Sequence, residues 1–335
     1  MTKKNNTNWI LILIAFLALS CVMLNSCGKK PQKVYRVGIL SGLNLFAGIA
    51  DSFKEEMTKL GYIEGKNIIY DFHKTNFEPD KEKQILNKFV ADKVDLIFGF
   101  NTEVALSAKE AAKGTDIPVV FAMGAIEGSS LVDSIPVPGG NITGVRYPGV
   151  EHAITRFEIL HEILPSAKRI WIPYQKGYPI AGYELNALRP LAASLNITLI
   201  EFPCDNLTHL KAELEKRSQS ADIGFDAVLY IPESLSTTKA AFEIIADFTR
   251  ERKIPIGGTK IVTEDYGTLF SVSVSYPEQG RLAAHLADKI LKGADAGKIM
   301  LVTPDPYILF NYKVAHELNL TIPESLLGKA NEIIR

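Results

Sequence analysis

The chain has 335 residues, and its 37 lysine and arginine residues nearly balance its 38 aspartate and glutamate residues, so that the formal net charge is −1. This balance provides no basic footprint for nucleic acid, and we expect no nucleic-acid partner. Hydrophobic residues make up 47% of the sequence, which is ample for a packed core. The length is too great for one small domain and suits two lobes.

The first 26 residues have the layout of a secretory signal peptide, because two lysines precede an apolar run from Trp9 to Leu24 and the small Ser26 stands directly before Cys27. The stretch 24–27 resembles the lipobox of bacterial lipoproteins, in which the cysteine thiol is lipidated, the chain is cut before it and the new terminus is acylated by a fatty acid such as palmitate. We therefore predict lipidation at Cys27, a tether at 27–33 and an exported protein anchored to the cell membrane, facing the periplasm or the cell exterior. Two alternatives remain open: acylation at Cys21, and an uncleaved membrane anchor, since the apolar run is just shorter than the roughly 17 to 25 residues that span a bilayer.

Short runs rich in β-branched residues alternate with helical patterns from residue 34 onward, which predicts an α/β fold with parallel sheets covered on both faces. In the first half, Ile49, Phe53, Met57 and Leu60 recur at helical spacing. The predicted order there is a strand at 34–40, a helix at 49–60, a strand at 67–72, a helix at 79–93, a strand at 95–100, a helix at 104–113 and a strand at 117–122.

The second half repeats this order. Strands predicted at 168–174, 226–232 and 254–259 match those at 34–40, 95–100 and 117–122, and the separations between them are similar. Two lobes of the same doubly wound, Rossmann-like topology explain the repeat better than one large sheet, whereas a solenoid would need many short units. A helical pattern at 181–195 contains Pro190, which either kinks one helix or begins a second.

The predicted loops at the carboxyl ends of the strands are the expected place for a ligand, because open α/β sheets bind ligands there. Their hydroxyls, amides, carboxylates and aromatic rings suit a small polar or aromatic molecule. The aromatic candidates can stack on a flat ligand or pack in the ordinary way. The candidate binding residues are Ser41, Phe46, Asn101, Thr102, Met123, Gln175, Tyr178, Glu233, Ser234 and Tyr276.

Two of these candidates have a structural alternative. Thr102 can contact a ligand or cap the helix predicted to begin near Val104. Glu233 can bind a ligand or be a solvated loop carboxylate. Trp171, in contrast, lies within a predicted buried strand and is expected in the core.

Signals for catalysis are scarce. The 6 histidines are scattered, with no pair at the spacing of metal ligands, and no Gly-x-Ser-x-Gly motif occurs. Cys204 is the only cysteine of the mature chain besides Cys27, so that no intramolecular disulfide is expected if Cys27 is acylated. We expect no metal, no cofactor and no enzymatic activity.

Four stretches, at 138–145, 164–169, 280–293 and 315–323, together resemble the substrate-binding lipoproteins of ABC importers, in the branch associated with tryptophan and tyrosine uptake. The resemblance implies a type I periplasmic-binding fold, whose two lobes are joined by three crossings, near 145–152, 273–277 and 293–298, and close on a ligand. It also implies a monomer that delivers its small-molecule ligand to the permease and ATPase subunits of an importer.

The domain boundaries follow from this resemblance. The N lobe is expected at 34–147 plus about 277–296, and the C lobe at 148–276 plus about 297–310. A helical segment at 311–335 is assigned to neither lobe.

The chain departs from the branch in three loops. The stretch 123–128 stands where members usually carry Asp-Pro, and 175–177 stands where they usually carry Asn-Pro with a nearby serine. Glu233-Ser234 stands where an Asp-Asn pair is common. Thr102, in contrast, matches a threonine of the family's pattern. Glu233 is expected to bind the ammonium of an amino acid, and Thr102, Ser234 and the main chain near Gly124 its carboxylate. The expected ligand is an aromatic amino acid such as tryptophan or tyrosine. A different solute, a sensory lipoprotein that signals to a membrane partner, and an extracytoplasmic enzyme on this fold are the alternatives.

Overall fold

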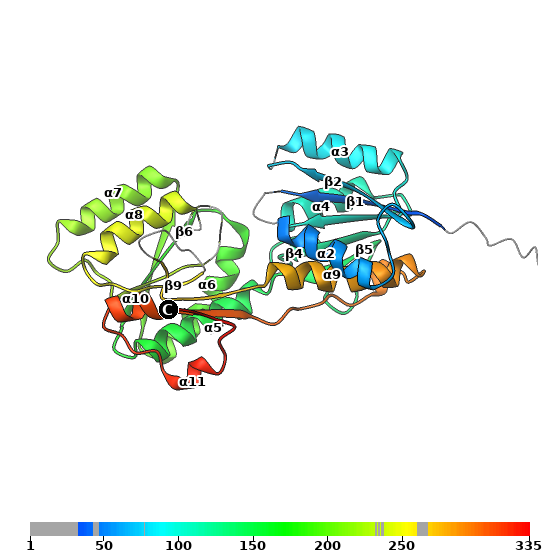
Figure 1. The fold of residues 1–335 in the computed structure, drawn as a ribbon. Coiled ribbons are helices and arrows are strands. Elements are labelled where there is room, and N and C mark those ends of the chain that lie inside the picture. The colour runs from blue at the N-terminus through cyan, green and yellow to red at the C-terminus, as the bar shows by residue number, and fades with distance from the viewer. Residues whose placement is uncertain are drawn as a thin grey trace, which may run out of the picture.

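The computed structural model describes residues 33–42, 47–76, 78–231, 233, 235, 238–259 and 267–335. Figure 1 shows two lobes side by side, each with a sheet and its own helices. The leader and the candidates Cys27, Phe46 and Ser234 lie outside the described residues.

The N lobe contains a parallel sheet of five described strands in the order β2-β1-β3-β4-β5. Its central strands are buried on both faces, as long apolar runs require. Helices α2 and α9 cover one face, and α3 and α4 cover the other. The elements are β1 (Tyr35–Ser41), α2 (Ala47–Lys59), β2 (Ile68–Lys74), α3 (Pro79–Ala91), β3 (Leu96–Phe100), α4 (Thr102–Ala111), β4 (Val119–Gly124), β5 (Ile142–Arg146) and, from later in the chain, α9 (Tyr276–Leu291) and η2 (Ala296–Lys298).

The C lobe contains a sheet of seven described strands in the order β12-β11-β10-β9-β8-β6-β7, in which only the β10–β11 pair is antiparallel. Its core includes Trp171, which is fully buried, as predicted, and stacks on Phe225 with ring centroids 5.1 Å apart. The elements are α5 (Gly149–Ile163), β6 (Arg169–Gln175), α6 (Pro179–Ser194), β7 (Thr198–Cys204), α7 (Leu207–Ser218), β8 (Ala227–Leu229), α8 (Lys239–Arg250), β9 (Ile256–Gly258), β10 (Phe270–Ser273), β11 (Tyr307–Asn311), α10 (Tyr312–Glu317), α11 (Glu324–Leu327) and β12 (Glu332–Ile334).

Helix α6 runs through Pro190 without a break. Pro190 lies on the exposed side of the helix, and so does Asn186, whose carbonyl loses its intrahelical partner. Water can satisfy that carbonyl, and the helix therefore tolerates the proline.

The chain passes between the lobes at three described places (Figure 1). The first crossing joins β5 to α5 and the second joins β10 to α9, close to the predicted positions. The third lies later than predicted, after Val302, because Val302 forms a β-bridge with Val145 and Leu301 is buried in the N lobe. Residues 297–302 therefore pack with the N lobe. The segment 311–335 packs with the C lobe and contains a strand, β12, besides its helices.

Among the described residues, no helix is both long enough and apolar enough to cross a membrane.

Candidate functional site

Loops at the carboxyl ends of both sheets meet where the lobes adjoin. The loop after β4 touches α6, because a Cβ atom added to Gly128 would lie 2.7 Å from Cε2 of Tyr183. Burial, and after it the carboxylate of Glu103 in α4, raise the pKa of Tyr178 at the start of α6, so these residues from different lobes are also close. Ligands bind at this end of the strands in open α/β sheets. We call the region between these loops the interlobe site.

The start of α4 forms one side of the interlobe site. Asn101 occupies the N-cap position with a φ of 44°, and its Nδ2 donates a hydrogen bond to Oε2 of Glu103 at 2.5 Å. Thr102 is the first residue of the helix, and its Oγ1 accepts a hydrogen bond from the main-chain N–H of Ala125 at 2.9 Å. Thr102 thus joins α4 to the loop after β4 instead of capping its own helix.

Met123 lies near the end of β4, just before the loop at 125–128, and Ser41 lies farther inside the N lobe. Met123 has a φ of 56°, and its N–H donates to Oε1 of Gln279 at 2.9 Å. Ser41 is fully buried at the end of β1, where its carbonyl accepts a hydrogen bond from the N–H of Thr75 at 3.0 Å. Of the two candidates, Met123 lies at the end of a strand beside the interlobe site, and Ser41 belongs to the packed interior.

The C lobe brings two further candidates to the carboxyl end of its sheet. Gln175 is half-buried at the end of β6, in register with Cys204. Glu233 is only 4% exposed, and its Oε2 accepts a hydrogen bond from the N–H of Leu235 at 2.7 Å. Glu233 is therefore not a solvated loop acid, because it is buried and helps to order its own loop.

Three tyrosines converge where the lobes join: Tyr147 from the first crossing, Tyr178 from the start of α6 and Tyr276 from the start of α9. Burial, followed by the nearby carboxylates of Glu103 and then Glu233, raises the pKa of Tyr178 to about 12. Burial, followed by the proximity of Tyr147, also raises the pKa of Tyr276. All three phenols are neutral near pH 7, and Tyr276 also packs against the N-lobe core.

Two buried side chains that can carry charge, Arg156 and Glu184, lie close together in the C lobe. Nε and Nη2 of Arg156 donate to the carbonyl of Val272 at 3.0 and 2.8 Å, and Nη2 also donates to the hydroxyl of Tyr147 at 2.9 Å. Nη1 of Arg156 lies 3.8 Å from Oε2 of Glu184, and both side chains are fully buried. Burial raises the pKa of Glu184 to about 8, which Arg156 opposes and Glu127 of the N lobe reinforces. Arg156 thus connects the first and second crossings.

A second charged group spans the first crossing directly. Arg146, at the end of β5, is hydrogen bonded through Nη2 to Oε1 of Glu151 in α5, and its Nη1 lies 3.7 Å from Oε1 of Glu127. The neighbouring His152 is buried, and burial, followed by the charges of Arg156 and Arg146, lowers its pKa to about 3. His152 is therefore neutral at physiological pH.

The sequence analysis did not identify Tyr147, Arg156, Glu184 or Gln279. One signal was present, because Arg156 follows Ala153 at helical spacing on the apolar face of α5. Glu184 occupies the corresponding position on the apolar face of α6. A charged residue on the buried face of a helix requires a partner, and two such residues in adjacent helices indicate a pair.

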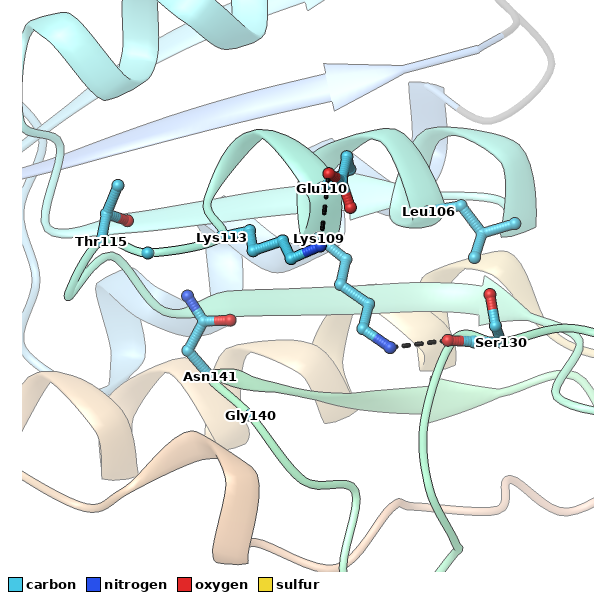
Figure 2. Close-up of a pocket in the computed structure, with 9 residues that line it drawn as sticks. Leu106, Lys109, Glu110, Lys113, Thr115, Ser130, Gly140 and Asn141 are labelled. Atoms are coloured by element: carbon cyan, nitrogen blue, oxygen red, sulfur yellow. Dashed lines mark hydrogen bonds and ion pairs between the residues drawn. The ribbon is translucent and has the colours of Figure 1, made fainter.

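Two hollows in the described surface lie elsewhere. One of about 530 Å³ runs along α4 to the amino-terminal edge of the N-lobe sheet (Figure 2), where Lys109 donates to the carbonyl of Ser130 and Lys113 pairs with Glu110. Another of about 460 Å³ adjoins it and includes Asp295. Both are at the end of the lobe opposite the interlobe site and contain none of the candidate binding residues.

In the described part of the chain, no group of three or more histidine, cysteine, aspartate or glutamate side chains is arranged to hold a metal ion. Cys204 is buried and not in a disulfide.

Comparisons with known proteins agree on the family. A curated relative, the "Tyrosine-binding protein" of Clostridioides difficile (strain R20291), is 28% identical over 255 residues, which are 76% of this chain and 71% of the relative. A solved ABC domain from Streptococcus pneumoniae in complex with L-Trp has a TM-score of 0.74 at 22% identity and covers 90% of this chain and 100% of its own. A ligand-free, open substrate-binding protein with adhesive properties from Clostridium difficile also has a TM-score of 0.74 at 22% identity, with coverage of 90% and 99%.

These likenesses show that the two lobes have the type I periplasmic-binding fold, as predicted. The family model for ABC transporter substrate binding proteins matches residues 39–334. Proteins of this kind bind solutes and are extracytoplasmic. The chain belongs to the ABC transporter substrate binding protein family.

Proposed function

We propose that this protein binds an aromatic amino acid, tyrosine or tryptophan, in the interlobe site and delivers it to the permease of an ABC importer. The observation that carries the proposal is the convergence of Tyr147, Tyr178 and Tyr276 from three different elements at the junction of the lobes. An aromatic side chain buries a large apolar area and gains further from stacked or edge-to-face rings. The relatives named for tyrosine and solved with L-Trp support this ligand class.

The charged ends of an amino acid need partners of both signs. Glu103, Glu127 and Glu233 supply carboxylates around the site, and Glu127 has a buried Oε2 with no hydrogen-bond partner among the described residues. The Thr102 hydroxyl retains its own hydrogen to donate, because it acts only as an acceptor toward Ala125. Charge-assisted hydrogen bonds to the ammonium and carboxylate would orient the ligand.

Delivery requires the protein to signal that it is loaded. Closure of the lobes about the three crossings would give this signal, because the permease would recognise the closed form. Lipidation at Cys27 would keep the protein at the membrane beside the permease, and more than one acyl chain is needed for stable anchoring. Mass spectrometry of the membrane-bound protein measures this directly, since an unmodified peptide containing Cys27 would rule the anchor out.

The departures in the loops 123–128 and 175–177 favour a second candidate, an importer receptor for another small solute. The fold itself accommodates such variety, because a solute-binding protein from Bacillus halodurans with bound myo-inositol has a TM-score of 0.60 to this chain at 13% identity. A sensory lipoprotein would use the same site with a different membrane partner.

Thermal unfolding of the purified protein against amino acids, sugars and nucleosides tests the proposal. A ligand that binds only the native state stabilises it by RT ln(1 + [L]/Kd), about 2.7 kcal/mol at a hundredfold excess over Kd. We expect Tm to rise with tryptophan or tyrosine and to stay constant with sugars and nucleosides. Thr102→Val should reduce the shift, whereas Thr249→Val should keep it, because that buried hydroxyl bonds only within α8. A shift with a different solute alone would replace the proposed ligand.

A further inference from the structure

The main chain at the end of β4 and the start of the following loop is fastened at three consecutive residues. The N–H of Met123 donates to Oε1 of Gln279, the carbonyl of Gly124 accepts from the N–H of Tyr147, and the N–H of Ala125 donates to Thr102, each at 2.9 Å. Two of the three partners adjoin crossings, since Tyr147 belongs to the first and Gln279 lies in the first turns of α9, directly after the second. The loop is thus attached to both hinge segments and to α4.

This fastening holds a conformation that the loop would not adopt alone. Met123 is not a glycine, yet its φ of 56° lies in the left-handed region, which side chains with a Cβ atom adopt only at a cost in free energy. The register of β4 on β5 also shifts between Phe121 and Gly124. Irregularities of this kind redirect the chain beside functional sites. Here the redirected chain carries Glu127 and Gly128 toward α6 of the other lobe.

Gln279 differs from Thr102, the other partner that bonds through its side chain, because it is fully buried. Its Nε2 has no hydrogen-bond partner in the described structure, so the single bond to Met123 is what offsets the desolvation of this amide. An apolar residue would be cheaper to bury at this point of α9. The amide at this position is therefore better explained by the hydrogen bond that its oxygen accepts from the N–H of Met123 than by its contribution to packing.

We propose that Gln279 is a positioning residue, which sets the segment 123–128 in its ligand-competent conformation. The ligand part of this inference rests on the proposed function. Because α9 packs on the same N-lobe sheet as β4, the bond between Met123 and Gln279 lies within one lobe, and it holds the segment that bears Glu127 in place as the lobes move.

Two variants and a matched control test the proposal. Gln279→Leu keeps the approximate size but removes the acceptor, and Gln279→Glu keeps an oxygen that can accept from Met123. Asn141→Leu is the control, because it removes a side-chain hydrogen bond to the carbonyl of Ile117 in the same lobe at the opposite end of the sheet. Tm without ligand, the calorimetric Kd for tyrosine and tryptophan, and hydrogen exchange at residues 123–125 are measured for each protein.

We expect Gln279→Leu to weaken binding roughly tenfold and to accelerate exchange at residues 123–125. Gln279→Glu should bind within about threefold of the wild type. Asn141→Leu should bind as the wild type does, even if its Tm falls as far as that of Gln279→Leu. Wild-type affinity and exchange in Gln279→Leu would overturn the proposal, and so would equal losses in Asn141→Leu.

The exchange measurement also separates the two proposals. If the wild type binds no aromatic amino acid, the proposed ligand fails, while faster exchange in Gln279→Leu that Gln279→Glu restores still supports the positioning role. If Gln279→Leu does not fold, Gln279→Glu alone decides, because unprotected amides at 123–125 in that folded variant contradict an acceptor role.

Discussion

Arg156 is fully buried, where desolvation of a charged group costs free energy, and its hydrogen bonds offset this cost. Three hydrogen bonds place its guanidinium between the first and second crossings, and Glu184 lies opposite its remaining nitrogen. The pair does not by itself argue for stability, because an apolar replacement is often as stable. Its contacts with Tyr147 and Val272 instead hold two hinge segments at a fixed separation on the C-lobe side.

The protonation of Glu184 makes stability depend on pH. Its pKa is about 8 in the folded protein, above the ordinary value near 4.5, so the folded state retains a proton that the unfolded state loses. The associated stability is fully present below about pH 4.5 and is lost as pH rises through 8, at up to about 1.4 kcal/mol per pH unit.

Glu184→Gln should therefore flatten the pH profile of stability. The amide keeps the shape but has no proton to release, so the variant should lose less stability than the wild type between pH 6 and about pH 9. Urea denaturation at several pH values measures this, with the exposed Glu110→Gln as a control that should keep the wild-type slope. Parallel profiles for the wild type and Glu184→Gln would show that Glu184 is ionised in the folded state.

The sequence predicts a residue's place in the site where that residue lies near the carboxyl end of a strand, because the ends of strands can be recognised from the sequence. Met123 lies near the end of β4, and Thr102 and Tyr178 come shortly after the ends of β3 and β6, so that all three lie at the carboxyl ends of the sheets. Gln279 and Arg156 were not predicted, because each lies within a helix whose repeating pattern indicates only a buried face. Their roles depend on elements far away in the sequence, and one chain without its fold does not show which faces meet.

At the scale of elements, the N lobe depends on a close approach between α2 and α9. A Cβ atom on Gly280 would lie 2.2 Å from the carbonyl oxygen of Ile49 and 2.8 Å from the main-chain nitrogen of Phe53. These are main-chain atoms, which cannot turn aside as a flexible side chain can. The packing of α9, and with it the position of Gln279, requires glycine here.

Gly280→Ala should accordingly destabilise the protein by about 1–3 kcal/mol, because the helices must separate. Gly48→Ala, in α2, is the matched control, since nothing lies within 4 Å of the added Cβ and alanine should gain about 0.5–1 kcal/mol in a helix. Chemical denaturation of both variants should show a lower free energy of unfolding for Gly280→Ala and a higher one for Gly48→Ala. A Gly280→Ala variant as stable as the wild type would mean that α9 packs less closely.

Most elements could be predicted from periodicity, because buried parallel strands are continuous apolar runs and the helices between them have regular apolar faces. The errors come from tertiary contacts. The third crossing was placed too early because the burial of Leu301 against the N lobe has no sequence signal. The short strand β12 was missed because it exists only by pairing with β11.

At the scale of the whole molecule, the crossings and the interlobe site form one connected structure. Tyr147 belongs to the first crossing and Tyr276 to the helix that follows the second, and the two lie near each other where the lobes join. Arg146 joins the N lobe to α5, and Gln279 joins α9 to the loop after β4. A ligand that contacts this region touches the segments about which the lobes would rotate, so binding energy can favour the closed arrangement.

Small-angle X-ray scattering of the purified protein, with and without saturating tyrosine or tryptophan, tests this account most directly. If an aromatic amino acid binds between the lobes and closes them, the radius of gyration should fall with that ligand and stay constant with a sugar that does not bind. An unchanged radius of gyration at a ligand concentration that raises Tm would contradict closure. An unchanged radius of gyration together with an unchanged Tm would contradict the proposed ligand itself.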